Sequence, residues 1–244
     1  MAAISPTRSR AAGPVLISFS GIDGAGKSTQ IANLEANLAD AGMRFTRLTL
    51  WDDVAVLKRF REDTMTRVFK GETGIGSPER PVRRNDKNVR RWYLTIGRCL
   101  LFFLDGIQLR KIVSNLRRMD VDVIIFDRYS FDELASLRLQ NRLTRIFARF
   151  LLRVVPCPDV GFVLDADPEV AHRRKPEYPV DFLHRYRDAY LFLAGSLPAM
   201  KVIEPGSPEQ VREHIWRHFS SIYESLPLRQ TLTNSLGAEE PHGI

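Results

Sequence analysis

Phe19-Ser20-Gly21-Ile22-Asp23-Gly24-Ala25-Gly26-Lys27-Ser28-Thr29-Gln30 is the stretch of sequence that decides the fold. It matches the phosphate-binding loop pattern of Gly, four residues, Gly-Lys and Ser or Thr. Glycines let such a loop curl until its N–H groups point at phosphate oxygens, and the following helix N-terminus adds partial positive charge. Lys27 can reach the β- and γ-phosphates, and the Ser28 hydroxyl can bind Mg²⁺. The stretch therefore predicts an ATP site formed by residues 21–29.

The residues on either side of the loop supply the required context. The apolar run 14–19 is typical of a buried strand, and Ile31, Leu34 and Leu38 lie on one face of a predicted helix. A glycine-rich turn without a ligand is the competing interpretation. It is disfavoured because every fixed position of the pattern is filled between a strand and a helix.

Length and composition indicate one α/β domain. The chain has 244 residues, of which 44% are hydrophobic and 27% charged, as in ordinary soluble globular proteins. We expect a kinase domain over 14–225 between disordered tails, 1–13 and 226–244. The first 14 residues lack the apolar core of a secretory signal, and the run 99–104 is too short to span a bilayer. A cytoplasmic protein without a membrane partner is expected.

The cysteines and the net charge add two further expectations. Cys99 and Cys157 give no disulfide framework. The net charge of +7 fits either nucleic-acid binding or arginines gathered around bound phosphates. We prefer the second interpretation, because the phosphate loop already supplies a polyanionic ligand and the sequence contains no nucleic-acid motif. The expected partner is a small nucleotide and not a nucleic acid.

Five apolar runs alternate with helical patterns. The predicted strands are 15–20, 43–50, 121–126, 160–164 and 201–203. The predicted helices run to about 42, from 52 or 53 to about 70, from about 88 with a kink or break at Gly97 or Gly106, and over 131–154, 169–174 and 181–193, with a last one from 208. Residues 71–87 are expected to be a mobile loop. This alternation predicts a P-loop α/β fold with a five-stranded parallel sheet covered on both faces. Ligands of such sheets bind beyond the strand C-termini.

Charged residues follow two of these strands. Asp127 closes an apolar strand, where phosphate-loop enzymes place an acidic residue that binds Mg²⁺ directly or through water; capping the next helix is its alternative role. Arg128 follows, and its guanidinium suits phosphate oxygens. Arg173 and Arg174 begin a short predicted lid over 173–180, where they can stabilise the transferring phosphoryl group. A solvated basic helix end is the alternative there.

The chain resembles the thymidylate kinase family over about residues 15–222. Residues 19–30 look like the start of such a kinase, and Leu100-Leu101-Phe102-Phe103-Leu104-Asp105-Gly106-Ile107-Gln108 is similar to the family's Leu-Leu-Phe helix. Asp127-Arg128-Tyr129 matches its Asp-Arg-Tyr motif, and residues 164–171 and 207–211 are similar to segments near its lid and C-terminal helix. The resemblance implies that Phe102 stacks on the acceptor base, that Arg128 contacts phosphate, and that the chain is a homodimer.

The chain departs from the family on the acceptor side. Thr49-Leu50-Trp51-Asp52-Asp53 stands in place of the family's Thr-Arg-Glu-Pro-Gly-Gly loop, and Gly106 falls where an Arg reads the thymine edge. Residues 130–135 do not clearly contain the serine and glutamine that usually follow Asp-Arg-Tyr. The donor side thus looks intact, whereas the acceptor side does not.

We therefore predict transfer of the γ-phosphoryl group of ATP to a nucleoside monophosphate, with dTMP favoured and Mg²⁺ as cofactor. The candidate catalytic residues are Lys27, Asp23, Arg128, Arg173 and Arg174. The candidate acceptor-binding residues are Trp51, Arg98, Phe102 and Arg128, and the candidate metal ligands are Ser28 and Asp127. Three alternatives stand: a kinase of another small acceptor, with Asp52 or Asp53 as base for a nucleoside; an ATP-binding module without turnover; and a nucleic-acid-associated ATPase.

Overall fold

A five-stranded, all-parallel sheet forms the centre of the protein. The computed structural model describes residues 13–50, 53, 92–137 and 142–225. The strands lie in the order β2-β3-β1-β4-β5. Their bounds are β1 Val15–Ser20, β2 Phe45–Thr49, β3 Val123–Asp127, β4 Val160–Leu164 and β5 Met200–Ile203. The predicted α/β class with five parallel strands is confirmed.

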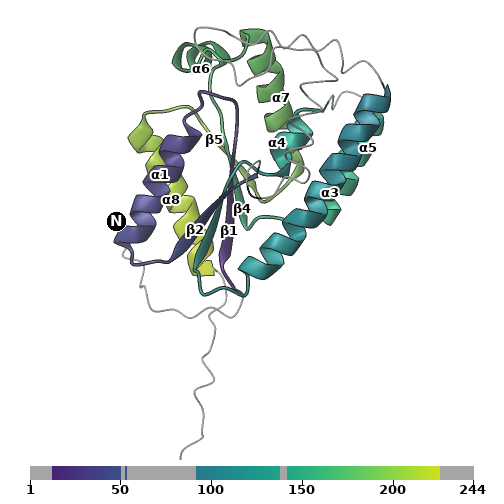
Figure 1. Ribbon diagram of the computed structural model, residues 1–244. Helices are drawn as coiled ribbons and strands as arrows, with labels where there is room; N and C mark the ends of the chain where they lie inside the picture. The colour runs from purple at the N-terminus through teal and green to yellow at the C-terminus, as the bar shows by residue number, and fades with distance from the viewer. Residues whose placement is uncertain (1–12, 51–52, 54–91, 138–141, 226–244) are drawn as a thin grey trace, which may run out of the picture.

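Helices cover both faces of this sheet. Their bounds are α1 Lys27–Asp40, α3 Trp92–Leu116, α4 Ser130–Ala135, α5 Arg142–Val154, α6 Pro168–Arg174, α7 Val180–Ser196 and α8 Pro208–Ser225. Figure 1 shows α1 and α8 together on one side of the sheet and α3, α4, α5 and α7 on the other. The strands are therefore buried on both faces, which is why they appear in the sequence as continuous apolar runs.

The central strand β1 divides its side chains between the two halves of the core. Val15, Ile17 and Phe19 belong to the cluster that includes α1 and α8, whereas Leu16 belongs to the cluster of the opposite face. All of these side chains are at most 1% exposed. Because β1 is paired on both sides and buried on both faces, the loop that follows it starts from a rigid position.

One prediction about the helices is wrong, one is confirmed and one is decided only in part. α3 continues through Gly97 and Gly106 as 25 helical residues, so the helix is not broken at either glycine, and a kink there stays a prediction. The helix expected over 131–154 is two helices, since α4 ends at Ala135 and α5 begins at Arg142. Gly42 follows α1 with a φ of 68°, which confirms it as the left-handed residue at the end of this helix.

Several predicted features fall outside the described residues. They are the two tails, the helix expected to end at about 70, and the loop 71–87. Among the helices of the described ranges, none combines the length and the apolar character that a bilayer-spanning segment requires. The residues that follow β1, β3, β4 and β5 all lie at one edge of the parallel sheet, and the candidate site is built there.

Candidate functional site

Glycines with positive φ shape the loop between β1 and α1. Gly21 has a φ of 140°, and a Cβ added to it would lie 2.6 Å from the carbonyl oxygen of Leu164. Gly24 has a φ of 86°, and a Cβ there would overlap the carbonyl oxygen of Ala171 in α6. Gly26 has a φ of 91°, but a Cβ there would meet nothing within 4 Å. The loop is therefore packed closely against β4 and α6, and it is open at the start of α1.

Lys27 lies inside the curl of this loop. Its Nζ donates to the carbonyl oxygens of Gly21 and Ile22, both at 2.8 Å, and lies 3.9 Å from Oδ1 of Asp23. The side chain is only 7% exposed. Burial and then the positive charge of Arg128 lower its pKa to about 8, against the opposing effect of Asp23. The loop thus holds a buried ammonium group within the cradle that the sequence pattern predicts for phosphates.

Arg128 connects this loop to β3. Its guanidinium forms an ion pair with Asp23 through Nη2, and its Nη1 donates to Oδ1 of Asp132 at 3.3 Å. Although burial alone would raise the pKa of Asp23, the charges of Arg128 and Lys27 hold it below its usual value. Lys27, Asp23, Arg128 and Asp132 thus form a chain of alternating charge across the sheet edge. Three of the predicted catalytic residues are brought together here.

Ser28 and Asp127 are the predicted metal ligands. Ser28 is exposed at the first turn of α1, and Asp127 ends β3. Oδ2 of Asp127 accepts a hydrogen bond from Nη2 of Arg47 in β2 at 2.6 Å, a partner that the sequence did not indicate. Within the described residues no group of three or more His, Cys, Asp or Glu is arranged to hold a metal ion. This donor set suits Mg²⁺ that arrives with phosphates, because Mg²⁺ usually needs only one or two protein ligands besides phosphate and water.

A shallow hollow of about 100 Å³ lies beside the loop, between β4, β5 and α6. Ala25 of the loop and Arg174 of α6 line it, together with the turn Glu204-Pro205-Gly206 after β5. Sequence reasoning missed this turn and the nearby Val170 and Val211. The signal was present, because a turn directly after the last parallel strand must lie at the same sheet edge as the phosphate loop. Arg174 therefore lies in the same hollow as Ala25 of the loop.

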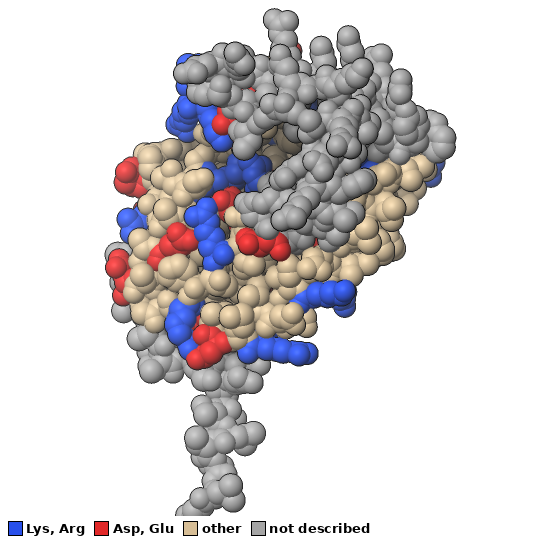
Figure 2. All heavy atoms as spheres, in the orientation of Figure 1, with Lys and Arg blue, Asp and Glu red and all other residues tan. Residues whose placement is uncertain are grey.

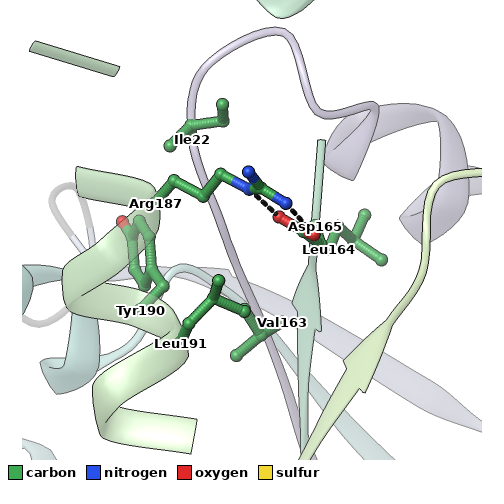
Figure 3. Close-up of a pocket in the computed structure, with 7 residues that line it drawn as sticks. All are labelled: Ile22, Val163, Leu164, Asp165, Arg187, Tyr190 and Leu191. Atoms are coloured by element: carbon green, nitrogen blue, oxygen red, sulfur yellow. Dashed lines mark hydrogen bonds and ion pairs between the residues drawn. The ribbon is translucent and has the colours of Figure 1, made fainter. Parts of the chain in front are cut away.

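Arg187 of α7 holds the end of β4 from below the loop (Figure 3). Its Nε and Nη2 donate to the two carboxylate oxygens of Asp165 at 2.6 and 2.7 Å. Ile22 of the loop and Tyr190, one turn further along α7, line the same small pocket as Arg187. A bidentate contact between an arginine and a carboxylate is stronger than a single neutral hydrogen bond. The contact between Arg187 and Asp165 joins α7 to the strand that borders both the loop and the hollow.

The segment predicted to form a lid, 173–180, lies within the described residues and begins at the end of α6. α6 begins with Asp167 as its N-cap, whose Oδ1 accepts from the Val170 N–H at 2.9 Å. Arg173 and Arg174 are exposed in its last turn, and of these two Arg174 lines the hollow. Lys175 follows; its Nζ lies 3.1 Å from Oε2 of Glu177. A role for Arg173 on the transferring group stays a prediction.

Of the residues predicted to bind the acceptor, the structure describes only some. Trp51 and Asp52 lie outside the described residues, and Asp53 Oδ2 accepts from the Thr49 N–H at 2.6 Å. Phe102 is 6% exposed and belongs to the core, with the Arg98 guanidinium 5.7 Å from its ring centroid. Arg98 Nη2 donates to the Ser136 hydroxyl at 2.7 Å. These contacts place Arg98 and Phe102 side by side on α3, and stacking of a base on Phe102 stays a prediction.

Gly106 has a packing reason of its own. A Cβ at this position would lie 3.1 Å from Cγ2 of Val155 and 3.2 Å from Cδ1 of Leu151. Position 106 therefore faces α5 and the residue after it, and a glycine lets α3 and α5 approach closely. An arginine at this position would have to displace these two side chains, so packing between α3 and α5 gives a reason for glycine at 106.

Figure 2 shows how the charges are distributed over one face of the molecule. On the described part of this face, Lys and Arg side chains lie next to Asp and Glu side chains instead of forming one broad basic surface. Ion pairs within the described residues include Arg44 with Asp120 and Arg47 with Asp127. The positive net charge is thus partly balanced locally on this face.

Comparisons with known proteins give a consistent result. The chain is 28% identical over 226 residues to a thymidylate kinase of Chlorobaculum tepidum, covering 82% of this chain and 94% of that protein. It is 27% identical to a thymidylate kinase of Chlorobium chlorochromatii and 25% identical to a probable thymidylate kinase of Archaeoglobus fulgidus, in each case over 82% of this chain and 92% of the other. No family model matches the chain. These similarities confirm the resemblance inferred from the motifs.

Proposed function

We propose that this relative of the thymidylate kinases transfers the γ-phosphoryl group of ATP to a nucleoside monophosphate, with dTMP as the favoured acceptor. One observation carries the proposal: the Asp23–Arg128 ion pair joins the phosphate loop to the arginine of the Asp-Arg-Tyr motif. A donor site and an acceptor clamp must lie this close for direct transfer between two phosphates. The similarity to thymidylate kinases over four fifths of the chain supports the choice of acceptor.

The donor side binds ATP through the loop and α1. The N–H groups of residues 21–29 and the buried Lys27 ammonium face the phosphates, and the hollow lined by Ala25 and Arg174 receives the base end of the nucleotide. Ser28 and the Asp127 side would hold the Mg²⁺ that accompanies ATP. When bound, that ion neutralises charge on the phosphate oxygens.

The acceptor side works by positioning. Arg128 binds the phosphate of the nucleoside monophosphate, and Asp23 keeps its guanidinium next to the loop. No general base is required, because the attacking group is already an anionic phosphate oxygen. Arg173 and Arg174 would stabilise charge on the transferring group from the lid. Since both substrates are cytoplasmic metabolites, we place the reaction in the cytoplasm, and a homodimer stays an expectation from the family resemblance.

A kinase with relaxed base selection is the second candidate. The observation that favours it is Gly106, whose position is filled by the contact with Val155 and Leu151. A site built on hydrogen bonds to the substrate rejects analogues that lack them, and a site without those bonds discriminates weakly. On this alternative dTMP, dUMP and dCMP are all accepted. Binding of ATP without turnover and nucleic-acid-stimulated hydrolysis are the remaining alternatives.

A substrate screen separates these candidates. Nucleosides and nucleoside monophosphates are offered with Mg-ATP, ADP release is measured, and the phosphorylated product is identified by chromatography. We expect dTDP from dTMP, with kcat/KM for dUMP and dCMP measured alongside. Comparable values for the three pyrimidines identify the relaxed enzyme. Thymidine as the better acceptor, ADP release only with added nucleic acid, or ATP binding without any product would each refute the proposal.

A further inference from the structure

The carboxylate of Asp132 is buried in the site and completely surrounded by donors. Asp132 is 4% exposed at the start of α4. Its Oδ2 accepts from the Ser20 hydroxyl at 2.7 Å and from the Tyr129 N–H at 3.0 Å. Its Oδ1 accepts from the Tyr190 hydroxyl at 2.8 Å and from Nη1 of Arg128 at 3.3 Å. Neither the phosphate-loop pattern nor the Asp-Arg-Tyr motif requires a carboxylate at this position.

Three of these four donors come from rigid parts of the fold. Ser20 ends β1, the Tyr129 N–H precedes α4, and Tyr190 lies in the middle of α7. Burial and the charge of Asp132 raise the pKa of Tyr190 well above its usual value, so its hydroxyl stays protonated and donates. The carboxylate is therefore fixed by β1, α4 and α7 before Arg128 is considered.

Arg128 is held between this carboxylate and that of Asp23. Nη1 donates to Asp132 and Nη2 to Asp23, which uses two of the five N–H groups of a guanidinium and leaves three for a ligand. Its backbone has a φ of 70°, the one positive value at a non-glycine residue within the described ranges, and its N–H donates to the Phe19 carbonyl at 2.9 Å. Backbone and side chain are both fixed, as a preorganised clamp requires.

We propose that Asp132 is a positioning residue of the phosphoryl transfer: its carboxylate orients the Arg128 guanidinium so that the free N–H groups meet the acceptor phosphate. This inference rests on the proposed function. Asp132 itself does not touch the substrate. It acts through Arg128, and it ties that clamp to α7, the helix that follows the basic lid.

The negative charge of Asp132 distinguishes a positioning role from a purely structural one. Neutral acceptors would satisfy the hydroxyls of Ser20 and Tyr190, whereas a buried carboxylate is costly to desolvate. Only the charge of Asp132 strengthens its contact with a guanidinium. The variant Asp132→Asn keeps size and shape and removes that charge, but it also turns one acceptor oxygen into an N–H donor beside Ser20 and Tyr129 or beside Tyr190 and Arg128. Its effect on Arg128 is therefore read against an Arg128→Ala background.

Kinetics of the full-length protein with dTMP and Mg-ATP provide the first test. We expect Asp132→Asn to lower kcat/KM for dTMP at least tenfold and to change KM for ATP less than twofold. Tyr190→Phe removes one donor to Asp132 without a change of charge, and we expect a smaller loss in the same direction. Asp122→Asn is the matched control, because Asp122 pairs with Arg44 before β3, outside the site.

A double-mutant cycle separates positioning from stability. If Asp132 acts through Arg128, then Asp132→Asn changes kcat/KM for dTMP less than twofold in an Arg128→Ala background. Losses that multiply across the two substitutions would overturn the proposal. So would a fall in melting temperature with unchanged KM and kcat, since a merely structural residue gives that result.

A spectroscopic measurement needs no substrate. In protein labelled with ¹⁵N-arginine, a guanidinium held by two carboxylates rotates slowly and gives separate Nη–H signals, which Arg128→Lys identifies by their loss. We expect these signals to collapse in Asp132→Asn and to persist in Asp122→Asn. Their persistence in Asp132→Asn would overturn the proposal. If the wild-type protein transfers nothing to dTMP, the proposed function fails, and these spectra alone decide whether Asp132 orients Arg128.

Discussion

The packing of the phosphate loop against α6 can be measured by comparing the stability of two variants, Gly24→Ala and Gly26→Ala. Gly24 and Gly26 have nearly the same φ, 86° and 91°, so an alanine at either position carries the same left-handed strain of about 1–2 kcal/mol. Only at Gly24 does the new Cβ also meet the backbone of α6, where it would lie 2.8 Å from the carbonyl carbon of Ala171. At Gly26 it meets nothing within 4 Å. Gly24→Ala should therefore be the more destabilising of the two substitutions.

The size of the difference follows from the overlap. Forcing extra atoms into a packed contact costs about 1–3 kcal/mol, and the neighbour at Gly24 is backbone that cannot rotate away. In a chain of this length 1 kcal/mol corresponds to about 2–4 °C in melting temperature. Gly26→Ala should lower the melting temperature by about 2–8 °C, and Gly24→Ala by about a further 4–8 °C for an overlap of about 2 kcal/mol.

Thermal unfolding followed by circular dichroism and urea unfolding at 25 °C both provide the measurement. Far-ultraviolet spectra of the two variants should match the wild type, because the sheet is unaffected. Equal losses of stability would show that the loop does not rest on α6, and the description of the donor site would then be wrong.

Four further substitutions test the site. Lys27→Ala should lower turnover at least about 100-fold while circular dichroism stays unchanged; activity near wild type would refute the phosphate-loop assignment. Arg128→Ala should raise KM for dTMP far more than KM for ATP. A larger rise in KM for ATP would show that Arg128 acts on the ATP side and not on the acceptor phosphate. Phe102→Ala should cost about 3–5 kcal/mol of stability because the ring is buried; Phe102→Leu, which keeps apolar bulk, isolates stacking, and an unchanged KM for dTMP would make Phe102 a core residue only. Gly106→Arg should lower the melting temperature without raising selectivity for dTMP over dUMP; a gain in selectivity would contradict the packing against α5.

The strand, loop and helix that form the phosphate-loop segment were predictable because their signals are local. Strand, glycines, lysine and helix follow one another within 26 residues, Val15 to Asp40, and each type has one physical use at its position. Gly42 was likewise identified as a helix end from its type alone, and its φ is positive. The parallel sheet followed from runs that are apolar on both faces.

Helix ends were harder, because tertiary contacts decide them. Gly97 and Gly106 cost a helix only about 1 kcal/mol each, which the packing of a 25-residue helix overcomes. Residues 131–154 contain neither Gly nor Pro, yet α4 ends at Ala135. There the Ser136 hydroxyl donates to the Glu133 carbonyl at 2.5 Å and accepts from Arg98 of α3. The hydrophobic periodicity of the sequence cannot indicate this contact, because Arg98 and Ser136 are 38 residues apart.

The network around Arg128 could not be predicted from the sequence for the same reason. Asp132 joins residues that lie 112 positions before it and 58 positions after it, and neither separation belongs to a motif. Arg47, which binds Asp127, is 80 residues from its partner. Residue types at strand ends indicated that charges meet at this sheet edge. Which charges pair depends on strand order and on helix placement, which a single sequence does not specify.

The pairing has a consequence for how acceptor specificity can change. Lys27, Asp23, Arg128 and Asp132 alternate in sign, so each charge is balanced by its neighbours and the chain of contacts needs no residue of the base-reading side. Arg128 is fixed by the phosphate loop on one side and by α4 and α7 on the other. On the proposed function, the phosphate clamp would keep its position when residues around the base are replaced. Such a separation would let the chain combine the proposed donor site and clamp with a Gly106 that serves the contact between α3 and α5.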